Sequence, residues 1–205
     1  VTLSGGQLLA SLLGVILLAF MSEQQLMDGG WRIPFVIGGI TAIISLLARS
    51  RLEETLSHED SERKESGSLR ALFQKHWKTF LLVVGYTSAG SLTFYVITVY
   101  SKTYLTNIGI DGKTVGFMMT CALFVFMLAQ PIFGMISDRI GRRASMLLFS
   151  ATSAIFIYPV MVVGMRHFSY SPVIVTLLLI FLMMLLSFYT SISGLVKAEM
   201  FPTHV

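Results

Sequence analysis

The chain has 205 residues, of which 54% are hydrophobic and only 13% are charged, with a net charge of +4. This charged fraction is about half that of an ordinary soluble domain. A soluble fold of this length has too little interior to cover so much apolar surface, so the expected solvent is a lipid bilayer. The single cysteine, Cys121, excludes an internal disulfide.

The sequence offers no sign of metal or cofactor chemistry. Its four histidines are scattered without the spacing of metal ligands, so we expect no metal site. The paired glycines at 5–6 and 38–39 fall inside apolar runs rather than in a phosphate-binding loop, and no cofactor is predicted. No arrangement of serine, histidine and acidic residues resembles a catalytic site, so an enzyme is disfavoured.

Six apolar runs are long enough, or nearly so, to cross a bilayer about 30 Å thick. We predict that all of them are helices, because a helix satisfies its own backbone hydrogen bonds and hydrocarbon offers no partners. The runs do not alternate between polar and apolar residues, as barrel strands do. The predicted spans cover residues 3–20, 31–49, 79–101, 113–137, 144–165 and 171–195. The predicted fold class is an all-α membrane protein.

Basic residues are distributed unevenly between the two ends of these spans. Eleven lie at the end that carries residues 49–78, 138–143 and 197, and four lie at the other end, at Arg32, Lys102, Lys113 and Arg166. Because loops rich in lysine and arginine stay inside the cell, the richer end is predicted to be cytoplasmic.

Residues 51–78 differ in character from the spans around them. They hold six acidic and six basic residues and few apolar ones. We expect a solvated linker, with an amphipathic helix near Leu69–Trp77 lying on the membrane surface. The linker separates residues 1–50, with two spans, from residues 79–205, with four, and is the predicted domain boundary.

The segment GMISDRIGRR at 134–143 lies between two apolar spans. Its charged residues are Asp138, Arg139, Arg142 and Arg143. A basic loop can be simply a signal for membrane orientation. The glycines add detail, because Gly134 can let a helix end pack closely and Gly141 can form a sharp turn. The carboxylate can accept backbone donors, and the last two arginines can each fork onto another carboxylate. We therefore predict a charged latch.

A polar stripe follows the span at 79–101 with helical spacing, and consists of Ser88, Ser91, Tyr95 and Thr98. In lipid such groups either bond to other helices or line a cavity. Tyr95 is the favoured residue of a substrate path, because its hydroxyl can donate to a carboxylate and its ring forms an apolar wall. Gln7 and Tyr189, in other spans, are further candidates.

A doubly charged anionic substrate needs cations. Arg32 could hold a carboxylate bidentately, although a role as an interface anchor is at least as well supported. Lys102 could extend its amine to the outer surface with no further role. No Asp or Glu lies in the middle of the six predicted spans, so a proton carrier is expected in a part of the protein outside this chain.

GMISDRIGRR matches the whole G-x-x-x-D-R-x-G-R-R signature of the major facilitator superfamily, which the chain resembles. SGGQLLASLLG at 4–14 and GGWRIPFVIGG at 29–39, followed by RLEET at 51–55, are similar to its metabolite:proton symporter branch. The stretches at 88–105, 120–143 and 187–202 extend the similarity to essentially the whole chain. The resemblance implies helices five to ten of a twelve-helix transporter, with both ends missing. It makes residues 1–50 the end of the N-terminal lobe and 79–205 the start of the C-terminal lobe.

The resemblance also implies proton-coupled uptake of a dicarboxylate such as α-ketoglutarate by alternating access, in the inner membrane and as a monomer. The loops at 51–78 and 138–143 would face the cytoplasm. Glu199 is then the nearest carboxylate in sequence for Arg142 or Arg143, and Glu53 would serve a corresponding loop that is absent here.

Several alternatives stay open at this point. Related members of the branch carry citrate, shikimate or osmolytes, and a membrane sensor could keep the fold without transporting anything. The expected partners are protons, a small carboxylate and the bilayer, and not nucleic acid. The chain alone is not expected to transport, because half of the cavity wall would be missing.

Overall fold

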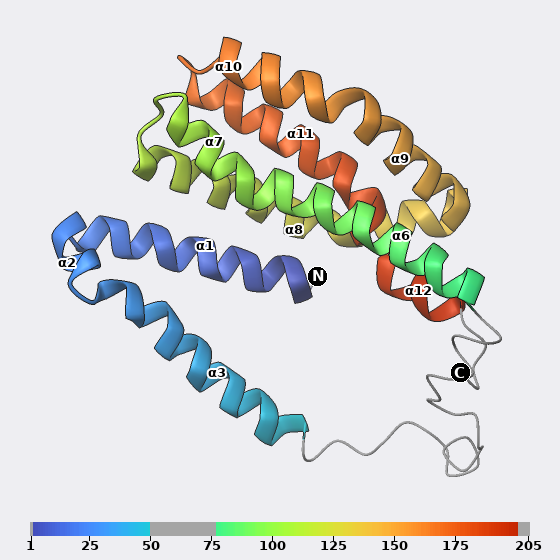
Figure 1. Ribbon diagram of the computed structural model, residues 1–205, viewed down its shortest axis with the longest axis horizontal. Helices are drawn as coiled ribbons and strands as arrows, with labels where there is room; N and C mark the ends of the chain where they lie inside the picture. The colour runs from blue at the N-terminus through green and yellow to red at the C-terminus, as the bar shows by residue number, and fades with distance from the viewer. Residues whose placement is uncertain (1, 50–76, 201–205) are drawn as a thin grey trace.

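The computed structural model describes residues 2–49 and 77–200, and every regular element in these ranges is helical (Figure 1). The predicted all-α membrane fold is confirmed. The predicted linker, its surface helix up to residue 76 and Glu53 lie outside the described residues.

The elements form two groups along the chain. Those before the linker are α1 (Thr2–Phe20), α2 (Glu23–Met27), the 3-10 turn η1 (Gly30–Arg32) and α3 (Ile33–Arg49). Those after it are α6 (Trp77–Tyr95), η2 (Val96–Tyr100), α7 (Ser101–Asn107), α8 (Gly112–Ile140), α9 (Arg142–Tyr158), η3 (Pro159–Gly164), α10 (Met165–His167), α11 (Pro172–Thr190) and α12 (Ser193–Met200). Both η2 and η3 are π-helical turns inside longer helices.

Five helices in the described ranges are long and apolar enough to cross a membrane: Gly30–Ala48, Trp77–Asn107, Gly112–Ile140, Arg142–His167 and Pro172–Met200. The remaining predicted span is a shorter apolar helix, Ser4–Phe20. The four helices after the linker run past most of the predicted ends, because the helix continues into the polar flanks of each apolar run.

Local sequence explains where α8 begins and ends. The Asp111 carboxylate accepts hydrogen bonds from the backbone N–H groups of Lys113 and Thr114 at 3.0 and 3.2 Å, which caps the first turn. At the other end Gly141 has a φ of +89° and a ψ of 148°, a conformation that side chains other than glycine rarely adopt. This glycine lets α9 start one residue after α8 ends.

The core lies between α8 and α11, which run side by side, with α6 and α9 against them. Its fully buried side chains are mostly large and apolar, among them Phe126, Leu179, Leu182, Met183 and Leu186. From the first group, α1 packs along α8, where Ser11 and Thr120 share a hydrogen bond of 2.8 Å. By contrast, α3 diverges from the bundle, and none of its membrane-length window is buried.

The two π-helical turns have local causes. η2 contains four consecutive β-branched residues, Val96 to Val99, which fit poorly in an α-helix. The Thr98 hydroxyl donates to the Phe94 carbonyl at 2.7 Å, and the Ser101 N–H bonds back to Val96, five residues earlier. η3 begins at Pro159, which has no N–H to give to the preceding turn.

Candidate functional site

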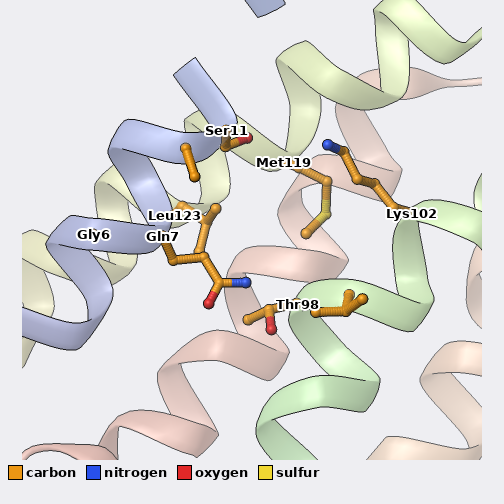
Figure 2. Close-up of a pocket in the computed structure, with 9 residues that line it drawn as sticks. Gly6, Gln7, Ser11, Thr98, Lys102, Met119 and Leu123 are labelled. Atoms are coloured by element: carbon orange, nitrogen blue, oxygen red, sulfur yellow. The ribbon is translucent and has the colours of Figure 1, made fainter. Parts of the chain in front are cut away.

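A cavity of about 850 Å³ lies between α1, the helix that contains η2, and α8 (Figure 2). Its polar and charged lining consists of Gln7 and Ser11 from α1, Thr98 from η2 and Lys102 from α7. The apolar wall includes Met119 and Leu123 of α8. The cavity therefore joins an element before the linker to elements after it, and Figure 2 shows Gln7 and Lys102 reaching toward the same space.

The hydroxyl groups in this cavity are already committed as donors. Thr120 donates to the Gly116 carbonyl at 2.9 Å, so in its bond with Ser11 the serine is the donor. Thr98 donates to Phe94. The Gln7 amide and the Lys102 ammonium make no hydrogen bond or ion pair with any other described residue, which leaves them as the free donors. Of the described residues that line the cavity, none is acidic. The site suits an anion.

The predicted polar stripe is placed differently from what we expected. Ser88, Ser91 and Tyr95 are not among the described residues that line the cavity. Tyr95 is 60% exposed, and its ring meets the edge of Phe94 with centroids 5.7 Å apart. One turn later, Val99 does line the cavity, so the stripe leads toward it along one helix face. Only Thr98 of the stripe has its side chain there.

Two other candidates are not part of the cavity lining. Arg32 lies in η1 with its guanidinium 5.4 Å from the centre of the Trp31 ring, an arrangement typical of an interface anchor. Tyr189 is buried, with its ring centre 4.9 Å from that of Tyr86 and 5.1 Å from that of Phe149. Its place is in the packing of α6, α9 and α11.

The structure brings Arg142 and Glu199 together as an ion pair. Arg142 is the first residue of α9, and Glu199 lies in the last turn of α12. Both elements follow the linker, so this pair joins two helix ends within one predicted lobe. The two side chains are 39% and 48% exposed, and an exposed pair of this kind contributes at most about 1 kcal/mol to stability.

Both members of this pair lie at the wrong end of a helix for their charge. The helix dipole disfavours a cation at the start of α9 and an anion at the end of α12, by about 0.3–1 kcal/mol each. Glu199 offsets the first effect for Arg142, and Arg142 offsets the second for Glu199. A sequence that keeps two locally unfavourable charges in contact is consistent with a functional latch.

The other residues of the 134–143 segment have no such partner in the described part of the chain. Asp138 is exposed in the last turns of α8 and forms no ion pair there, and Arg143 is exposed as well. Arg139 lies in the last turn of α8, where the dipole favours a cation. A Cβ at Gly134 would meet nothing within 4 Å, so the close packing expected at this glycine is not present among the described helices.

A buried polar link between α8 and α11 was missed by reasoning from the sequence. The Gln130 amide donates to the Ser187 hydroxyl at 3.3 Å and accepts from the Thr190 hydroxyl at 3.0 Å. Gln130 is only 3% exposed, next to Pro131 in an apolar run. A lone amide in such a run was the available signal, because it needs a partner in lipid.

The fold and site define a multi-pass, all-α membrane protein with a polar cavity between its helices. A family model described as Major Facilitator Superfamily matches residues 82–205. The chain belongs to this superfamily of transporters.

Two relatives illustrate its neighbourhood within the family. The chain is 46% identical over 206 residues to the alpha-ketoglutarate permease of Escherichia coli (strain K12), an alignment that covers 100% of the chain and 47% of that protein. It is 30% identical over 207 residues to the proline/betaine transporter of the same strain, covering 93% of the chain and 40% of the relative. The chain thus spans about half the length of the curated relatives it matches. No solved structure matches it.

Proposed function

We propose that the protein containing this chain takes up a dicarboxylate such as α-ketoglutarate together with protons, as a secondary active transporter. The observation that carries the proposal is the 46% identity, over the full chain, to a protein named alpha-ketoglutarate permease. The cavity agrees in chemistry, because its free donors are a lysine and an amide and its described lining holds no carboxylate.

In this proposal the carboxylate of the substrate pairs with Lys102 and accepts a hydrogen bond from Gln7. The two residues belong to elements on opposite sides of the linker. Rocking of one lobe against the other would therefore change the distance between them and expose the substrate first to one side and then to the other. Alternating access follows from a site shared between two moving bodies.

Orientation and coupling are part of the same proposal. The end of the bundle with the 138–143 turn would face the cytoplasm of the inner membrane, because it carries most of the basic residues. The Arg142–Glu199 pair would hold the ends of α9 and α12 together there. No described residue that lines the cavity is a carboxylate, so the proton carrier would lie elsewhere in the protein.

The decisive experiment is uptake of labelled α-ketoglutarate into proteoliposomes that contain the full-length protein, with and without an inward proton gradient. We expect uptake that the gradient stimulates and that excess succinate inhibits. Unstimulated uptake would remove the proton coupling and keep the substrate. Absence of uptake by folded protein would contradict the proposal and favour a sensor.

The relative named proline/betaine transporter supports an osmolyte as the second candidate substrate. Glycine betaine carries a quaternary amine that a lysine in the cavity would repel, so we expect it to compete poorly. Strong competition by glycine betaine and none by succinate would favour the osmolyte.

A further inference from the structure

A second, smaller pocket adjoins the cavity and shares one residue with it. Its volume is about 310 Å³, and it is lined by Lys102, Thr103, Thr106, Asn107, Gly112 and Val115. It lies where α7 meets the start of α8, at the end of the bundle opposite the Gly141 turn. We call it the vestibule. Lys102 also lines the cavity, so this side chain stands between the two spaces.

The vestibule has the chemistry of an anion site. Its polar residues are a lysine, two threonines and an asparagine, and none of its described lining residues is acidic. The nearby carboxylate of Asp111 is occupied by the backbone N–H groups that it caps. A carboxylate in this pocket would thus meet donors without an opposing negative charge in its wall.

The backbone around Lys102 is held firmly while its side chain is free. Ser101 and Leu105 on either side are fully buried, and the Lys102 carbonyl accepts a hydrogen bond from Thr106 at 3.0 Å. The lysine side chain is exposed and makes no ion pair with any described residue. A flexible four-carbon stem on a fixed backbone can turn its ammonium from one pocket to the other.

We propose that the vestibule is a capture site for the substrate anion, in which a carboxylate pairs with Lys102 before the same side chain carries it into the cavity. This inference rests on the proposed function, since it assigns the first step to a dicarboxylate substrate. It gives Lys102 a positioning role in entry as well as a binding role in the cavity. It also assigns Asn107, which lines only the vestibule, to capture.

The test uses four single variants of the full-length protein, reconstituted in liposomes. Lys102→Gln removes the charge from both pockets, and Lys102→Arg keeps it. Asn107→Leu alters only the vestibule. Lys113→Gln is the matched control, because Lys113 is a basic residue at the same end of the bundle that lines neither pocket.

We expect Lys102→Gln to raise the KM for α-ketoglutarate roughly ten- to a hundredfold, since it removes a charge-assisted contact. Lys102→Arg should stay near the wild-type KM. Asn107→Leu should raise KM with little change in maximal rate, and Lys113→Gln should match the wild type. A wild-type KM in Asn107→Leu, with uptake intact, would overturn the capture site and leave the proposed function standing.

A second measurement does not depend on transport. An amine-reactive label on Lys102 is quantified by mass spectrometry in detergent, with and without α-ketoglutarate. We expect the anion to protect Lys102 in the wild type and less so in Asn107→Leu. Protection without any wild-type uptake would uphold the anion site and contradict the transport function, whereas neither protection nor uptake would overturn both.

Discussion

At the scale of single residues, one glycine fixes how closely two helices approach. Gly90 in α6 faces the ring of Tyr189 in α11, and a Cβ placed on this glycine would overlap the ring atoms. The ring is also held by Tyr86 and Phe149, so it has little room to move. Tyr189 thus serves the packing of the bundle rather than a substrate path.

We expect Gly90→Ala to destabilise the protein by about 1–3 kcal/mol, because an overpacked core forces side chains off their preferred conformations. Thermal unfolding of the full-length protein in detergent measures the effect. Gly85→Ala, in the same helix, is the control, since a Cβ there would meet nothing within 4 Å. Equal stability of the two variants would show that α6 and α11 are farther apart than described.

The buried link at Gln130 predicts an asymmetry between its two sides. Gln130→Leu should cost only about 0.6 kcal/mol, because Ser187 and Thr190 keep bonds to the Met183 and Leu186 carbonyls. The double variant Ser187→Ala/Thr190→Val should cost about 1–3 kcal/mol, because it leaves the amide buried without these partners. Thermal unfolding compares the two, and the reverse order would mean that the amide finds other partners.

At the scale of the helices, the Arg142–Glu199 pair allows a test that separates attraction from local charge placement. Exchanging the charges in Arg142→Glu/Glu199→Arg restores the pair and puts each charge at the end of the helix that favours it. We expect the exchanged protein to unfold at the wild-type temperature or above it, and each single reversal to unfold below it.

Transport by the same variants tests the latch. If the pair acts through attraction alone, uptake lost in each single reversal should return in the exchanged protein. Stability that returns without uptake would assign the polarity of the pair to contacts beyond Glu199. Uptake unchanged by the single reversals would contradict a latch at this position.

The sequence predicted the helices well and their faces poorly. Long apolar runs dictate helices in lipid, and Gly141 marks the turn between α8 and α9. Which residues meet across helices is a different question, because a span that is apolar all round carries no periodic signal of its inner face. Tyr95 was therefore favoured although it lies outside the cavity lining, and Gln130 was overlooked although it is buried.

At the scale of the whole molecule, α1 is the part of the first helix group that packs along the bundle. The Ser11–Thr120 bond crosses from one side of the linker to the other. Alternating access requires these two groups to move against each other, so α1 and α8 should not keep one fixed contact through the cycle.

We expect a short thiol cross-link between Ser11→Cys and Thr120→Cys, in a background without Cys121, to stop uptake reversibly. Reduction of the link should restore transport. The control pair is Phe156→Cys/Phe181→Cys, whose native rings lie 5.4 Å apart in helices that both follow the linker. Full uptake with the first pair cross-linked would contradict rocking at this interface.

The π-helical turn at 96–100 has a consequence for how this span can change in evolution. Such a turn holds about one residue more than an α-helical turn, so every later residue is rotated by roughly 100°. Deleting one residue here would restore a regular helix, keep its hydropathy and rotate Lys102 away from the position that it now shares between cavity and vestibule. A change in chain length, with no change in the residues of the site, would then be enough to alter what the site binds.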